Sequence, residues 1–223
     1  MGGNSGRRAK KSVQQRELEV AQDLLARAFK VTQEQATAFK QPEVQATAHH
    51  EAGHVVAAMH YELKFTYVTI IPDEQQESLG HVHFRGLGDS VFKRFENSRP
   101  TDRMQMDIER HVITMLTAGA AEARFRGRRN YRGARKDRED AAELVKSGRA
   151  GADLVLLKKY LDYTQEVAMC FVADNRNWNN IRKVAAALLA HPRHRLSQPE
   201  VRAVLHGRPI IVSKTRRTTT PPL

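Results

Sequence analysis

The sequence predicts a mainly α-helical protein with a small β element. Most segments between glycine, proline and polar breaks repeat apolar residues at helical spacing. Only two short stretches, FTYVTIIP and LGHVHF, are rich in the β-branched and aromatic residues that favour strands. The chain has 40% hydrophobic and 28% charged residues, which is typical of a globular chain with a real core.

The N-terminal half is expected to begin with helices. Residues 14–30 place apolar side chains on one broad helical stripe, and Thr32 can cap a shorter helical piece that ends near Pro42. A long helix follows over residues 43–63. The two strands are expected over residues 65–72 and 79–84.

The C-terminal half is expected to be helical throughout. Helices are predicted over residues 102–125, 137–146, 152–175 and 177–190. Thr101 can cap the first of these, and Ser197 with Glu200 has the spacing of a capping box. The last helix should end at Gly207, and residues 208–223 are expected to be disordered.

The net charge of +12 is concentrated in residues 1–16, 124–138 and 214–217. We interpret these segments as solvated ends and a basic loop rather than as a nucleic-acid surface. No apolar window is long enough for a membrane span, and the N-terminus lacks a signal peptide's apolar core, so we expect a cytoplasmic protein without membrane contact. Cys170 is the only cysteine, which excludes an intramolecular disulfide and a cysteine-based metal cluster.

The hexapeptide HHEAGH, residues 49–54, indicates a metal site. Residues four apart lie on one helical face, so His50 and His54 can present two imidazoles to one point. Zinc accepts such nitrogens, and Glu51 beside them can act as a general base on a water molecule, as in the zincin pattern. His49 falls about 100° around the helix, and we expect it next to the site or at the surface.

The residues between the two ligands support the metal site over a merely polar helix face. Ala52 and Gly53 are small and would let another element approach. Glycine destabilises a helix by about 1 kcal/mol, which indicates a packing reason for Gly53. A third ligand must come from elsewhere, and because no histidine has the metzincin spacing, a carboxylate is the next candidate.

Several motifs occur together in a recognisable order. HEAGH is followed by VTIIP, LGHVHF, AGAAEARF, RGARKDREDAAEL and a long C-terminal segment ending in LSQPEV. This series resembles the peptidase domain of the FtsH family of zinc proteases over residues 43–206. The resemblance implies an FtsH-type zincin peptidase domain with Asp137 as the third zinc ligand. The chain departs from the family pattern at Lys136, where asparagine is usual, and around residues 147–153.

Two other carboxylates remain candidates for the third ligand. Glu122, in AGAAEARF, is a candidate because gluzincins use a glutamate as the third ligand. If Glu122 is not the ligand, we expect it to support the site as a structural or neighbouring carboxylate. Asp140 lies three residues after Asp137 on the same predicted helix and is the weaker option.

The strand LGHVHF is a candidate substrate-binding element. If it lies at a sheet edge beside the metal, its unpaired backbone groups can take up an extended peptide as an added strand. The residues concerned are Leu79, Gly80, His81, Val82 and His83. His81 and His83 would point to the same face, toward substrate or solvent.

These observations predict a zinc-dependent endopeptidase that binds one zinc ion per chain and cleaves unfolded polypeptides. The resemblance implies an ATP-driven module, but this sequence has no phosphate-binding loop, so we expect ATP-independent activity and leave open a homo-oligomer and a separate unfolding partner. The expected divisions are a basic arm and helix (1–42), the peptidase domain (43–206) and a basic disordered tail (207–223). Two alternatives remain: a zinc-stabilised, non-catalytic binding module and a nucleic-acid-binding protein.

Overall fold

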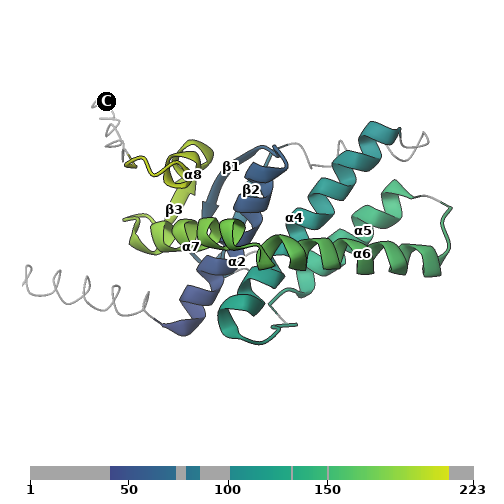
Figure 1. The fold of residues 1–223 in the computed structure, drawn as a ribbon, viewed down its shortest axis with the longest axis horizontal. Helices are drawn as coiled ribbons and strands as arrows, with labels where there is room; N and C mark the ends of the chain where they lie inside the picture. The colour runs from purple at the N-terminus through teal and green to yellow at the C-terminus, as the bar shows by residue number, and fades with distance from the viewer. Residues whose placement is uncertain (1–40, 74–78, 86–100, 132, 150, 211–223) are drawn as a thin grey trace, which may run out of the picture. The chain divides into compact units, whose positions relative to one another are not determined.

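A computed structural model describes residues 41–73, 79–85, 101–131, 133–149 and 151–210. The chain divides into two compact units, Met1–Gln41 and Pro42–Leu223. The described part of the second unit contains six helices and a three-stranded antiparallel sheet, which confirms a mainly helical fold with a small β element (Figure 1). The helices predicted before residue 41 and the tail from residue 211 lie outside the described residues. None of the described helices is long and apolar enough to cross a membrane.

All six described helices match predicted ones. They are α2 (Pro42–His60), α4 (Asp102–Arg126), α5 (Arg135–Gly148), α6 (Leu154–Ala173), α7 (Asn175–Ala190) and α8 (Gln198–Leu205). Thr101, Asp153 and Asp174 cap α4, α6 and α7, each accepting a hydrogen bond from the backbone N–H three residues later. The predicted capping box is present, since Glu200 accepts a 2.7 Å hydrogen bond from the Ser197 N–H.

The sheet consists of β1 (Phe65–Thr69), β2 (His81–Phe84) and β3 (Arg195–Ser197) in the order β2-β1-β3. The expectation of only two strands was wrong. β3 escaped detection because three residues are too few to show alternation, and Ser197 is also the start signal for α8. β2 has one strand neighbour among the described residues and therefore lies at the sheet edge, as the substrate-binding hypothesis requires.

Helix α2 is the centre of the packing. It contacts α4 along most of its length and α7 on another side, while α5 and α6 pack on α4 (Figure 1). A Cβ at Gly53 would lie 2.9 Å from both Ala118 Cα and Ala121 Cβ, so only glycine allows α4 to come this close. This confirms the predicted packing reason for Gly53 and brings α4 directly beside the turn of α2 that carries His50 and His54.

Candidate metal centre

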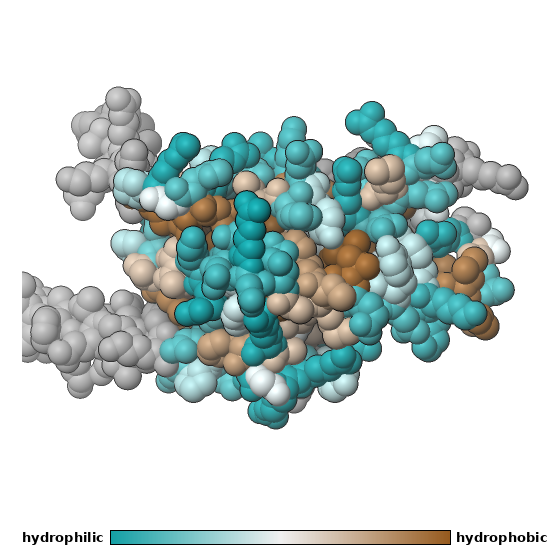
Figure 2. Space-filling model, in the orientation of Figure 1, coloured by the Kyte–Doolittle hydropathy of each residue, from teal (hydrophilic) through white to brown (hydrophobic). Residues whose placement is uncertain are grey.

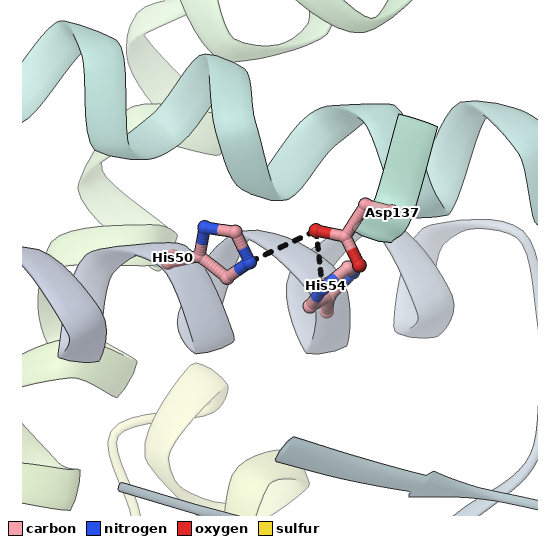
Figure 3. Close-up of side chains that lie close together, drawn as sticks. All are labelled: His50, His54 and Asp137. Atoms are coloured by element: carbon pink, nitrogen blue, oxygen red, sulfur yellow. Dashed lines mark ion pairs between the residues drawn. The ribbon is translucent and has the colours of Figure 1, made fainter. Parts of the chain in front are cut away.

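Three side chains from two helices meet at one point (Figure 3). His50 and His54 lie one turn apart on α2, and Asp137 lies in the first turn of α5. Asp137 Oδ2 is 2.9 Å from His50 Nε2 and 3.4 Å from His54 Nε2. One ligand atom from each residue lies within 4.8 Å of the others, so this partly buried group could bind a metal ion. The structure thus brings together the three predicted ligands.

The far side of each imidazole is held by an oxygen acceptor. His50 Nδ1 lies 3.1 Å from Glu122 Oε2, and His54 Nδ1 lies 3.1 Å from the Thr114 carbonyl oxygen. Because these oxygens only accept hydrogen bonds, both Nδ1 atoms carry protons and donate them. In the neutral form of each imidazole the Nε2 lone pair therefore faces the common point, which is the usual orientation of metal-binding histidines.

Glu122 supports the site from behind and does not enter the three-residue group. Its Oε2 accepts from His50, and its Oε1 accepts from Arg126 Nε and Asn130 Nδ2, each at 2.7 Å. The interpretation of Glu122 as a supporting carboxylate therefore fits the structure, and its interpretation as a ligand does not. Asp140 is exposed and also lies outside the group.

Sequence reasoning missed the polar contacts that position Glu122 and the α4–α5 loop. Asn130 donates to Glu122 and accepts a 3.1 Å hydrogen bond from the Gly133 N–H, so it connects the loop before Asp137 to the carboxylate behind His50. Arg126 connects Glu122 to Glu43 at the start of α2. The ion pair of Glu122 and Arg126 could have been predicted from their four-residue spacing on a helix. Nothing in the sequence singled out Asn130.

Two buried carboxylate oxygens have no assigned hydrogen-bond partner, and they allow a test of whether a metal ion fits the site. Asp137 Oδ2 is buried and has no assigned hydrogen-bond partner, although it lies within 3.4 Å of both Nε2 atoms. Glu51 Oε2, on a side chain only 4% exposed, also has no donor. Buried polar atoms are normally satisfied, and a cation at the common point with a water molecule beside Glu51 would satisfy both. The residues present therefore fit a metal ion.

The acidic and basic side chains of the site shift one another's pKa values. Burial would raise the pKa of Asp137, but the neighbouring histidines hold it well below its usual range. Burial would lower the pKa values of His50 and His54, but Asp137 raises both above the ordinary range. Burial raises the pKa of Glu51 to about 7 despite the nearby histidines. A cation binding here must displace protons from the two imidazoles.

The edge strand approaches the group at Glu51. A Cβ at Gly80 would lie 2.9 Å from Glu51 Cγ and 2.8 Å from the Thr69 carbonyl oxygen, so Gly80 lets strand and helix touch. The rings of His81 and His83 both contact Tyr67, which places them on one face of the sheet. Of the other proposed substrate-binding residues, Leu79 is exposed and Val82 pairs with Val68.

His49 takes no part in the group. Its ring stacks on Phe125 at a centroid distance of 4.1 Å and also contacts Trp178. Its Nδ1 bonds to the Gln45 carbonyl oxygen. The residue therefore helps α2 pack against α4 and α7. We had expected it next to the site or at the surface.

Replacing Glu122 by glutamine should weaken metal binding about tenfold without abolishing it, because a neutral amide holds the His50 Nδ1–H less strongly than a carboxylate does. The measurement is zinc affinity by competition with a chromophoric chelator. Glu139→Gln, which changes an exposed carboxylate on α5, is the matched control and should leave the affinity unchanged. Complete loss of binding in the Glu122 variant would make Glu122 a ligand after all.

No family model matches the sequence, and no curated protein matches it. The resemblance to the FtsH family thus rests on the motifs alone and stays a prediction. Fold and site together define a mainly helical protein with a two-histidine, one-aspartate group that could bind a metal ion.

Proposed function

We propose that this chain is a zinc-dependent endopeptidase. The observation that carries the proposal is Glu51, whose buried and unpartnered carboxylate oxygen lies beside the group of His50, His54 and Asp137. Two imidazoles and one carboxylate form a ligand set typical of catalytic zinc sites, which keep one position open for water. The ordered motifs shared with FtsH-type peptidases support the same assignment.

Glu51 acts as the general base and then as the acid. Bound zinc would supply Lewis acidity, lowering the pKa of a water molecule and polarising the scissile carbonyl. Glu51 accepts a proton from the attacking water as the water oxygen bonds to the carbonyl carbon. It then delivers that proton to the amide nitrogen as the C–N bond breaks, which leaves a carboxylic acid and an amine.

β2 supplies the binding edge for substrate. Its outer backbone groups have no strand partner among the described residues, so an extended peptide can pair with them as an added strand. Gly80 places this edge directly beside Glu51, which brings a paired peptide close to the catalytic carboxylate. Side chains of such a peptide would alternate between the face of His81 and His83 and the opposite face.

The deciding experiment combines metal analysis with digestion of casein, with and without a chelator. We expect about one zinc per chain, and hydrolysis that the chelator stops and added zinc restores. Zinc without any turnover would favour the non-catalytic binding module. Absence of zinc, together with nucleic-acid affinity that falls steeply with salt, would favour the nucleic-acid-binding alternative.

The peptidase should strongly prefer unfolded substrates and ignore ATP. Strand addition needs an extended segment, and opening one in a folded domain costs part of a stability of about 5–15 kcal/mol. This sequence has no phosphate-binding loop with which to supply that energy. The test compares one substrate domain in its stable form and in a destabilised variant, with and without ATP. Equal rates on both forms, or stimulation by ATP, would contradict the prediction.

A further inference from the structure

A concave surface lies next to the candidate metal centre. It is a groove of about 890 Å³ between α4, α5 and α6. Met115, Leu161 and Met169 contribute to its apolar floor, together with alanines of α4 and α5. Asp137 reaches its wall, whereas Glu51, His50 and His54 do not line it. Figure 2 shows apolar surface gathered along α6 and at the end where that helix begins.

The rim of this groove is positively charged. Among its acidic residues, Glu139 is paired with Arg135 and Asp162 with Lys158. Arg129 donates a hydrogen bond to the Met169 sulfur, and the Arg138 guanidinium lies over the Tyr131 ring. Neither has an ion pair with a carboxylate among the described residues. These two exposed guanidinium groups leave the rim with a net positive charge beside an apolar floor.

The dimensions of the groove match a helix. Its α6 wall runs from Lys158 to Ala173, which is about 22 Å at the α-helical rise and equals about four turns. The groove is bounded by three helices and open on one side, so an occupant would keep one face in water. Methionine side chains adapt to varied apolar partners and are common in helix-binding grooves.

We propose that this groove binds an amphipathic helix of a partner protein, with its apolar face on the floor and acidic side chains against Arg129 and Arg138. Charge complementarity selects the acidic partner, because a basic helix would repel the uncompensated guanidinium groups. The docked helix also contacts the first turn of α5 through Asp137. The proposal rests on the groove and its charged rim, and it holds whether or not the chain hydrolyses peptides.

The test uses the full chain carrying Glu51→Gln, so that the probe is not cleaved. The probe is a fluorescein-labelled helical peptide of about 15 residues, with leucine on one face and glutamate on the other, and binding is read by fluorescence anisotropy. We expect saturable binding, and binding at least about tenfold weaker for the same peptide with lysine in place of glutamate. The double variant Arg129→Glu, Arg138→Glu should reverse this preference.

The matched control is Arg176→Glu with Lys183→Glu, which reverses two exposed charges on α7 outside the groove and should leave peptide binding unchanged. Equal binding of the glutamate and lysine peptides, or equal loss in the control variant, overturns the proposal. So does the absence of saturable binding up to about 1 mM. If the chain self-associates, and the Arg129→Glu, Arg138→Glu variant does not, then the occupant of the groove is a second copy of the chain and not a partner protein. Circular dichroism verifies that each variant is folded.

Discussion

Glu51→Gln is expected to lower the rate of peptide hydrolysis by about a thousandfold or more while zinc stays bound. The amide keeps the shape of the carboxylate but cannot accept a proton from water, and general-base catalysis contributes about 10²–10⁴-fold. Glu51 is not one of the three residues that could hold the metal, so the zinc content should not change.

The measurement pairs initial rates on fluorescently labelled casein with the zinc content of the same preparation. Glu143→Gln removes an exposed carboxylate from α5 and should leave both values unchanged. An active parent enzyme and a fully active Glu51 variant would sink the assignment of Glu51 as the base. A variant that loses its zinc would show that Glu51 holds the metal and would leave the role of the base to another residue.

The part of the site that could be predicted from the residues alone is the part contained in one helical turn. His50, Glu51 and His54 lie within five consecutive residues, so the helical repeat alone puts the two histidines on one face and Glu51 beside them. Gly53 belongs to the same turn, and its cost to helix stability indicated the close approach of another element, which the structure shows to be α4. Local geometry is sufficient for each of these inferences.

The rest of the site depends on contacts between distant segments. Asp137 lies on another helix more than eighty residues away and was proposed from the ordered motifs, because no local spacing connects it to α2. The residues alone could not choose between Asp137 and Glu122. The choice depends on which side of the His50 ring each carboxylate reaches, and that is set by how α4 and α5 pack. Asn130 was missed for the same reason, since its two partners come together only in the folded loop.

Asp137→Ala should remove both zinc and activity. Asp137 Oδ2 lies close to both Nε2 atoms, so the substitution removes the one acidic side chain of the candidate group and leaves two imidazoles on one helix face. Catalytic zinc sites hold the metal with three protein ligands, and two should not retain it against a competing chelator. The fold should survive, because Asp137 lies in the first turn of α5 and its side chain is partly exposed.

The experiment measures zinc content after dialysis against a chelator, casein hydrolysis and circular dichroism for Asp137→Ala, Asp140→Ala and Glu122→Ala. We expect zinc and activity to disappear only in the Asp137 variant. The Asp140 variant should retain both, because that side chain is exposed. The Glu122 variant should retain most of its zinc. Loss of zinc confined to the Glu122 variant would move the third ligand from α5 to α4. It would also mean that the match between the basic segment 124–138 and the FtsH pattern is out of register, because the assignment of Asp137 began from that match.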